Sequence, residues 1–370
     1  MDFINGFIEV YGDPLGLKGS WEGLVEYVDE TATRRTLTIS ENAQWFEDHS
    51  PVDPRFRKPE VKGFTARAIC AAMLGGDEYP ATAIGINLPN ADWIRARYGS
   101  KSITISNITD AYNKAAHGSG FREEFVIDGE TLALIERYGD ACDDLHTDLH
   151  ECLGHGSGQL LPGVNGEALK AYGNTIEEAR ADLFALYYLA DPKLIELGLL
   201  PDGEAYQAAY YTYMMNGLLT QLVRIEPGRQ LEEAHMRNRA LIARWCLANG
   251  NSMELVKREG KTYLQIHSYE ALRQEVARLL GEVQRIKSEG DYEASRQLVE
   301  GYAVKIDPVL HEEVLSRYKK LDLAPYKGFI NPWLLPVYNK DGNITDIQVN
   351  YSESYEHQML RYSTEYGTLI

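Results

Sequence analysis

The pattern of hydrophobic and polar positions changes near residue 130. Before it, short apolar runs between turn residues predict strands over Phe3–Tyr11 and Trp21–Val28, and a strand-and-turn region over residues 80–106. After it, apolar residues recur at helical spacing. This spacing predicts helices over residues 130–153, 175–190, 203–224, 229–249, 267–288 and 291–300. From Ile306 onward, recurrent prolines predict loops and short strands that return to the first part of the chain.

This distribution predicts an α+β, mainly α fold with two lobes and a cleft between them. We expect a helical lobe made of residues 31–74 and 107–315. A smaller mixed β/α lobe would combine residues 1–30, 75–106 and 316–370. The length of 370 residues fits two domains of ordinary size.

Composition narrows the class of protein. A hydrophobic content of 44% and a charged content of 25% are globular values, which argues against a disordered chain. The 37 basic and 55 acidic residues give a net charge of −18, and no basic stripe is present, so nucleic acid is not an expected partner. No apolar run reaches the ~18 residues that a membrane-spanning helix needs.

Cysteines and the N-terminus point to a reducing compartment. The four cysteines are far apart and form no CxxC pair, which argues against a disulfide framework or a cysteine-based zinc site. The first residues, MDFINGFIEV, have no basic region and no small-residue cleavage site. We therefore expect a cytoplasmic protein with reduced thiols.

The most informative segment runs from His150 to His155 and reads HECLGH. Zinc hydrolases with an HExxH motif place two histidines at i and i+4 on one helical face, with the glutamate beside the metal-bound water. Here the spacing is i, i+5, which on a regular helix would turn the second imidazole ~140° away from the first. Gly154 resolves this, because a residue without a Cβ allows a local π-bulge that returns both imidazoles to one side.

A catalytic zinc needs a third protein ligand and one open position for water. The segment from Asn174 to Asp182 supplies a carboxylate on a nearby helix. If Asn174 is the N-cap, Glu177 falls at the capping-box position. Glu178 is then left for the metal, with Asp182 one turn later on the same face, where it can orient a ligand imidazole.

The two motifs together resemble the dipeptidyl peptidase III family. Residues 150–158 (HECLGHGSG) and 177–182 (EEARAD) are similar to the family motifs HExxGH and EExRA(E/D). Further segments resemble the family in the family's order along the chain: FIEVYGDP at residues 7–14, GINLPN at 85–90, EAHMR at 233–237 and EGYA at 300–303.

The resemblance implies a role for each matching residue. His150, His155 and Glu178 would bind one Zn²⁺ ion, and Glu151 would be the general base. The resemblance also implies contacts with the peptide. Tyr11 and His235 would stabilise the tetrahedral intermediate.

The other matching residues would bind the substrate. The free α-ammonium of a short peptide would be held by Glu9, Asn87 and Asn90. Gly85 would pair with the peptide backbone, and Arg317 would lie near the C-terminal side of the peptide.

The resemblance implies a zinc exopeptidase that releases dipeptides from the free N-terminus of short peptides. Members of this family are longer, so we expect the smaller lobe to be incomplete and expect self-association through it. Two alternatives stay open: a non-catalytic zinc-binding chain that binds peptide or a protein partner, and another type of oligopeptide zinc hydrolase.

Overall fold

The chain divides into two units in a computed structural model that describes residues 2–6, 21–61, 65–76, 85–88, 101–323 and 330–365. The sheet unit consists of Met1–Arg34, Arg67–Tyr112 and Ala324–Ile370. The helical unit consists of Arg35–Ala66 and Asn113–Leu323. The helices α1 (Glu30–Glu41) and α4 (Ser106–Ala116) each begin in the sheet unit and end in the helical unit. The fold is α+β and mainly α, as the sequence predicts.

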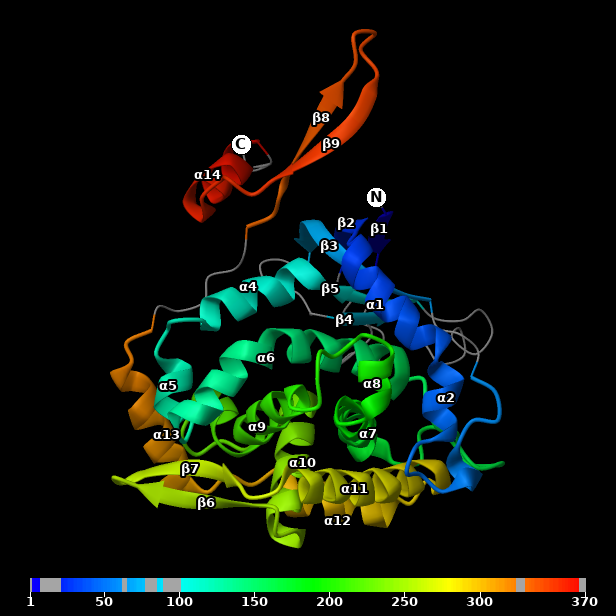
Figure 1. The fold of residues 1–370 in the computed structure, drawn as a ribbon, viewed down its shortest axis with the longest axis vertical. Coiled ribbons are helices and arrows are strands. Elements are labelled where there is room, and N and C mark those ends of the chain that lie inside the picture. The colour runs from blue at the N-terminus through cyan, green and yellow to red at the C-terminus, as the bar shows by residue number, and fades with distance from the viewer. Residues whose placement is uncertain are drawn as a thin grey trace. The chain divides into compact units, whose positions relative to one another are not determined.

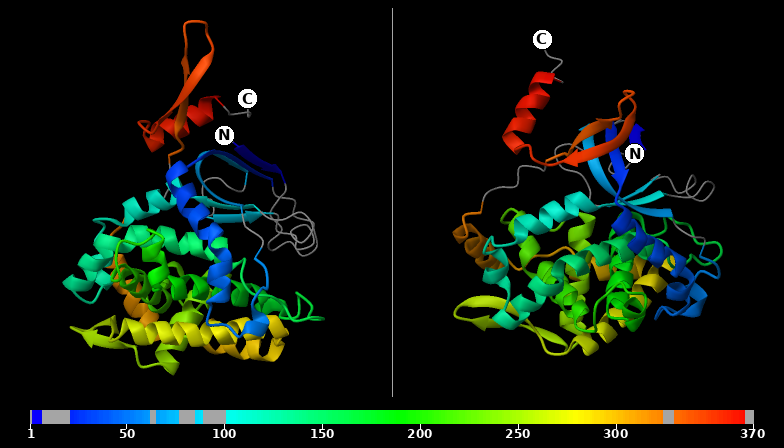
Figure 2. Two further views of the ribbon diagram at one scale, coloured as in Figure 1. Left: turned by 45° about the vertical axis from the view of Figure 1, so that its right-hand side comes forward. Right: turned by 45° about the horizontal axis from the view of Figure 1, so that its top comes forward.

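A five-stranded sheet forms the centre of the sheet unit, with the strand order β1-β2-β3-β5-β4 (Figures 1 and 2). Its strands are β1 (Asp2–Gly6), β2 (Glu22–Val28), β3 (Thr65–Gly76), β4 (Gly85–Leu88) and β5 (Lys101–Ile105). The apolar side chains that it buries are Leu24, Ile69, Ala71, Leu74, Ile103 and Ile105, together with Ile108 of α4. β4 lies at one end of the strand order and pairs with β5, so that Gly85 is opposite Thr104.

The sheet unit also contains the end of the chain. β8 (Trp333–Tyr338) and β9 (Ile344–Asn350) form an antiparallel hairpin, and α14 (Tyr355–Glu365) follows it. The predicted short strands of the tail are therefore present. Some predicted boundaries differ from the observed units. Residues 316–323 belong to the helical unit and not to the smaller lobe, and β3 belongs to this sheet and not to the helical lobe. Ala68, Ile69, Ala71 and Ala72 are all buried, and a continuous apolar run of this kind does not distinguish a strand from a buried helix.

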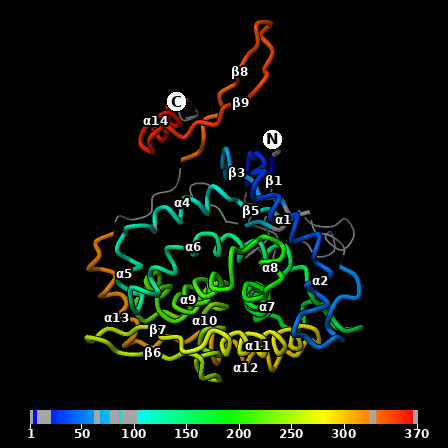
Figure 3. Tube along the Cα trace, in the orientation of Figure 1, coloured from blue at the N-terminus to red at the C-terminus, as the bar shows by residue number. Residues whose placement is uncertain are grey.

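The helical unit surrounds the buried helix α7 (Gly173–Leu189), which packs against α6, α10 and α11 (Figures 1 and 3). Burial on nearly all sides matches its sequence, which is apolar around most of the helix from Ile176 to Leu189. The other helices of this unit are α2 (Ala43–Asp48), α5 (Phe121–Phe125), α6 (Gly129–Leu149), α8 (Pro192–Glu196), α9 (Ala205–Leu218), α10 (Ala234–Asn249), α11 (Tyr269–Glu289), α12 (Tyr292–Tyr302) and α13 (Pro308–Lys320). Short 3-10 helices cover Pro54–Phe56, Lys170–Tyr172 and Thr220–Arg224.

The predicted helices of this unit are confirmed, with shifts at their ends. The sequence pattern missed the hairpin of β6 (Met253–Arg258) and β7 (Lys261–Ile266), and it missed α13. Recurrent prolines after Ile306 predict loops, but Pro308 occupies the first turn of α13, where proline has no hydrogen bond to lose. The side chain of Asp307 caps this helix by accepting from the backbone N–H groups of Val309 and Leu310. Within the described residues, no helix is both long and apolar enough to cross a membrane.

The end of α6 has the irregular backbone that the histidine spacing predicts. Residues His150–Gly154 form a π-helical turn, in which the N–H of His155 donates to the carbonyl oxygen of His150 at 3.1 Å. Gly154 faces α7 directly. A Cβ at this position would lie 2.7 Å from the Cα of Ala181 and 2.9 Å from its carbonyl oxygen. Glycine is therefore required here for the close approach of the two helices as well as for the local bulge.

Arg317 of α13 is buried in a network of internal contacts. Its guanidinium donates to the Glu124 carboxylate at 2.8 Å, to the Thr262 carbonyl at 2.6 Å and to Glu313 at 3.2 Å, and it also bonds the Glu124 carbonyl. Only 3% of its side chain is exposed, and the guanidinium lies 4.3 Å from the ring centre of Phe125. These contacts give Arg317 a structural role, because they use its donors inside the helical unit. That it lies near the C-terminal side of a bound peptide stays a prediction.

We expect Arg317→Met to lower the free energy of unfolding by about 1–3 kcal/mol, because the carbonyl oxygens of Thr262 and Glu124 lose a buried donor, while Lys261 still pairs with the Glu124 carboxylate. Denaturant unfolding measures this change. The matched control is Arg296→Met, which removes an arginine from exposed pairs with Glu293 and Glu300 and should change stability by less than ~1 kcal/mol. Unchanged stability together with weaker peptide binding would favour a role in substrate recognition.

We expect Gly154→Ala to destabilise the protein by about 1–3 kcal/mol, because the added methyl overpacks the contact with Ala181. Gly301→Ala in α12 is the control, since a Cβ there meets no atom within 4 Å. Its effect should be neutral or stabilising, as alanine is the better helix former. If both variants unfold at the same denaturant concentration as the unmodified chain, the steric argument is wrong.

Candidate metal centre

Four titratable side chains converge where the π-turn meets α7 and the start of α10. Their centre is the Glu178 carboxylate on α7. The Nε2 atoms of His150, His155 and His235 lie 3.3, 3.9 and 3.4 Å from its Oε2 atom. The rings of His150 and His155 are nearly perpendicular, with centres 4.7 Å apart, so the π-turn brings both imidazoles to one side.

The Glu178 Oε2 atom provides a test of whether the site suits a metal. It is buried and accepts no hydrogen bond from the described residues, although imidazole nitrogens surround it. Ligands of a tetrahedral zinc with bonds of ~2.1 Å lie ~3.4 Å apart. The separation of 3.3 Å between Glu178 and His150 matches this value, and that of 3.9 Å between Glu178 and His155 is somewhat longer. Burial would raise the pKa of Glu178, but His150, His155 and His235 outweigh it and lower the pKa. The donor set, two imidazoles and one carboxylate, fits zinc.

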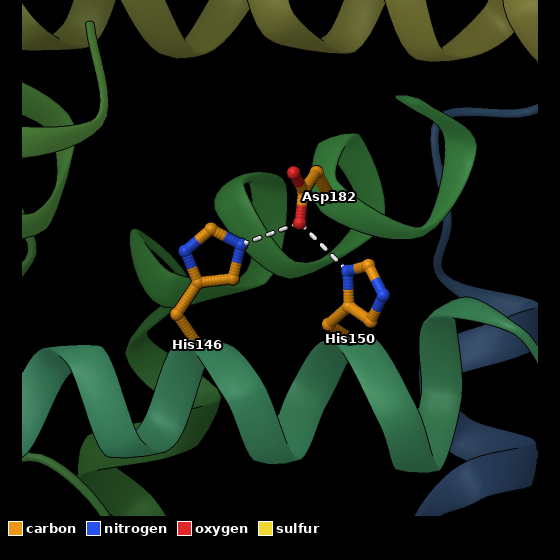
Figure 4. Close-up of side chains that lie close together, drawn as sticks. All are labelled: His146, His150 and Asp182. Carbon is orange, nitrogen blue, oxygen red and sulfur yellow. Dashed lines mark hydrogen bonds and ion pairs between the residues drawn. The ribbon is translucent and has the colours of Figure 1, made fainter. Parts of the chain in front are cut away.

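Asp182 fixes the ring of His150 from the side opposite Glu178. Its Oδ1 atom is 2.6 Å from His150 Nδ1 and 3.1 Å from His146 Nε2, so it lies between two imidazoles one helical turn apart on α6 and the π-turn (Figure 4). Its Oδ2 atom accepts from Tyr213 at 2.7 Å and from Asn238 at 3.0 Å. Because Nδ1 of His150 donates to Asp182, its Nε2 keeps a free lone pair for a metal.

Glu177 performs the equivalent task for His155. Its Oε1 atom lies 2.9 Å from His155 Nδ1, and the fully buried Arg180 donates to the same carboxylate at 2.7 and 3.1 Å. Lys287 of α11 also pairs with it. Burial would raise the pKa of Glu177, but Arg180 and Lys287 hold it well below the ordinary value.

This contact corrects the predicted start of α7. Asn174 is not the N-cap, because the helix already begins at Gly173 and Tyr172 is the preceding residue. No side chain of the described residues caps this end. Glu177 does not occupy the predicted capping-box position, and its carboxylate instead contacts the ring of His155. The 3-10 turn Lys170–Tyr172 runs directly into the helix, which local sequence rules do not anticipate.

Glu151 and His235 lie beside the same centre. A carboxylate oxygen of Glu151 and ring nitrogens of His150 and His155 lie within 4.8 Å of one another. His235 is half exposed, and its Nδ1 is 2.6 Å from Glu233 Oε1. The same Glu233 carboxylate caps α10 by accepting from the backbone N–H groups of His235 and Met236. The hydrogen bond to Glu233 raises the pKa of His235, Glu178 adds to the effect, and burial opposes it.

His146, His150 and Asp182 form a second cluster with atoms close enough to share an ion, all within 4.8 Å. The carboxylate of this cluster is already satisfied, because each oxygen of Asp182 accepts two hydrogen bonds. The Glu178 Oε2 atom, in contrast, accepts none from the described residues. The metal position that the geometry favours is therefore the one beside Glu178, and Asp182 supports it from behind.

The remaining predicted residues belong to the sheet unit or lie outside the described residues. Gly85 is in β4, and so is the backbone of Asn87, whose side chain lies outside the described residues. Glu9, Tyr11 and Asn90 lie outside the described residues altogether. Their contacts with a peptide stay predictions.

Sequence reasoning missed the residues that hold the ligands in place: Glu177, Arg180, Lys287, His146, Tyr213 and Asn238. His146 had a signal, because it precedes His150 by four residues on a predicted helix and so shares its face. Tyr213 and Asn238 had none, since α9 and α10 reach Asp182 only through the tertiary fold.

Comparison with known proteins places the chain in a family. The model of peptidase family M49 matches residues 2–168 and 164–312, which is most of the chain. Dipeptidyl peptidase 3 of Rattus norvegicus and that of Homo sapiens are each 26% identical to it over 345 residues, or 82% of this chain. The match covers 46% of either relative, so the chain spans about half the length of these proteins.

A solved structure supports the fold. The structure of DPP III from Caldithrix abyssi matches with a TM-score of 0.71 at 23% identity, over 86% of this chain and 58% of that one. At this identity the likeness concerns the fold, whereas the family follows from the match to most of the sequence. The chain therefore belongs to peptidase family M49.

Proposed function

We propose that the protein is a zinc-dependent exopeptidase that releases dipeptides from the N-terminus of short peptides. The observation that carries the proposal is the buried, unbonded Glu178 Oε2 atom with the Nε2 atoms of His150 and His155 around it. Membership of peptidase family M49 supports the assignment as a peptidase. The release of dipeptides is suggested by the name of the relatives, dipeptidyl peptidase 3.

In this proposal His150, His155 and Glu178 hold one Zn²⁺ ion. When bound, zinc would lower the pKa of a water molecule and polarise the peptide carbonyl. Asp182 and Glu177 keep the two imidazoles in the tautomer that offers Nε2 to the metal. Their low pKa values keep both carboxylates ionised, which strengthens each N–H···O bond.

Glu151 is the general base of the proposed reaction. Within the described residues its carboxylate makes no hydrogen bond that would occupy it, and it lies next to both histidines of the centre. It would take a proton from the attacking water and deliver it to the nitrogen of the leaving amine. His235 would donate a hydrogen bond to the carbonyl oxygen as negative charge develops there, and Tyr11 would do the same.

The sheet unit would hold the peptide. β4 lies at the end of the strand order, and a terminal strand offers backbone groups to which an extended peptide can add. Gly85 would make this backbone contact, and Glu9, Asn87 and Asn90 would bind the α-ammonium group. That contact would set the cut after the second residue of the peptide.

The first experiment measures zinc content and peptide cleavage on the purified chain. We expect one zinc per chain and release of naphthylamine from a dipeptidyl-naphthylamide. Glu178→Gln should weaken zinc binding by more than ~100-fold, because it removes a charged ligand. Glu312→Gln, at an exposed position on α13, is the control.

Each possible result has a definite meaning. Cleavage of N-terminally blocked peptides would favour an endopeptidase. Stoichiometric zinc without any cleavage would favour a peptide-binding role, and absence of zinc would refute the metal centre.

A second experiment isolates Glu151. Glu151→Gln keeps the size of the side chain and removes the base, so turnover should fall by at least ~10²-fold while zinc content stays the same. Glu136→Gln lies on α6 at an exposed position and should leave turnover unchanged. Loss of zinc from Glu151→Gln would instead assign Glu151 to the metal-binding set.

A further inference from the structure

His146 has no part in the chemistry proposed above, yet it contacts Asp182, the carboxylate that orients His150. It precedes His150 by one helical turn, and both imidazoles point at the Asp182 carboxylate (Figure 4). The Nε2–H of His146 donates to Oδ1 at 3.1 Å, and the Nδ1–H of His150 donates to the same atom at 2.6 Å. The two histidines use different ring nitrogens for one acceptor.

Four donors together set the plane of the Asp182 carboxylate. Oδ2 accepts from Tyr213 and Asn238. Rotation about the Cβ–Cγ bond of Asp182 moves both oxygens together, so the contacts at Oδ1 and those at Oδ2 jointly resist it. His146 holds the side that His150 does not, so the plane of the carboxylate is set by contacts from α6, α9 and α10.

The ring of His146 is itself held in place. It packs against Tyr213, with ring centres 5.4 Å apart and an angle of 35° between the planes. Its side chain is 14% exposed and that of Asp182 is 10% exposed, so little water can replace the hydrogen bond between them. A buried acceptor that loses one donor keeps its desolvation penalty, which favours a shift of the carboxylate toward another donor.

We propose that His146 is a positioning residue, which fixes Asp182 and through it the orientation of the His150 ring for metal binding. The inference rests on the proposed function, since it concerns the zinc that His150 would bind. A positioning role differs from a merely structural one. It requires that the zinc affinity and the geometry of the metal site change when the Nε2–H donor of His146 is lost, even though the fold is kept.

The choice of variants follows from which nitrogen donates. Glutamine places an N–H near the position of His Nε2, whereas the asparagine side chain is too short to reach it. We expect His146→Leu and His146→Asn to weaken zinc binding by ~10-fold, at the lower end of the effects known for residues behind metal ligands. His146→Gln should remain within about twofold of the unmodified chain.

Zinc dissociation constants come from competition with a chelating dye, measured on the folded full chain. The visible spectrum of the cobalt-substituted protein gives a second readout, since its bands report the geometry of the ligands. His146→Leu and His146→Asn should shift these bands, and His146→Gln should restore them. If the leucine variant does not fold, the glutamine and asparagine pair still carries the comparison.

His311→Leu is the matched control. His311 is a buried histidine in the same unit, and its Nε2 contacts the carbonyl oxygens of Leu222 and Ile225. Its loss should lower the unfolding midpoint and leave zinc affinity unchanged.

Three results would overturn the inference. The first is a folded His146→Leu variant with the same zinc affinity and the same cobalt spectrum as the unmodified chain. The second is asparagine and glutamine variants that behave alike. Either result would leave the proposed function intact. Failure of the unmodified chain to bind zinc would overturn the proposed function itself, and the inference with it.

Discussion

The candidate metal centre depends on two carboxylate–imidazole pairs that are buried together. Asp182 holds His150 and Glu177 holds His155, and both carboxylates belong to α7. Burying these charges would be unfavourable if each were left alone, so every carboxylate also meets further donors. Glu177 pairs with Arg180 and Lys287, and Asp182 accepts hydrogen bonds from Tyr213 and Asn238. The orientation of the two imidazoles is therefore fixed by contacts within the helical unit.

In the proposed centre, one helix supplies both the carboxylate ligand and the carboxylates that orient the imidazoles. On α7, Glu178 faces the Nε2 atoms of His150 and His155, while Glu177 and Asp182 contact the Nδ1 atoms of the same rings. These three carboxylates keep fixed spacings as long as the helix is regular. The irregular backbone lies in the π-turn after α6, which brings the two histidines to the side that faces α7. The regular helix α7 therefore fixes the carboxylates, and the π-turn fixes the imidazoles.

Much of the site could be predicted because its signals are local. The spacing of His150 and His155 conflicts with a regular helix, and the conflict has a single simple resolution at Gly154. Residues that act across the fold gave no such signal. The inward turn of Glu177 depends on Lys287 of α11, more than a hundred residues away, and local capping rules assigned it elsewhere. The contacts of Arg317 gave no local signal either, since only the packing of α13 shows that its guanidinium pairs with Glu124.

The contact between Gly154 and Ala181 places a restriction on evolution that chemistry alone would not suggest. Ala181 is fully buried, and its Cα lies where any Cβ on residue 154 would press against it. It binds no metal and moves no proton, yet a larger side chain there would push the π-turn away from α7. Selection for a working metal centre would then act on a methyl group as strongly as on a ligand. A position conserved for this reason would easily be mistaken for a catalytic one.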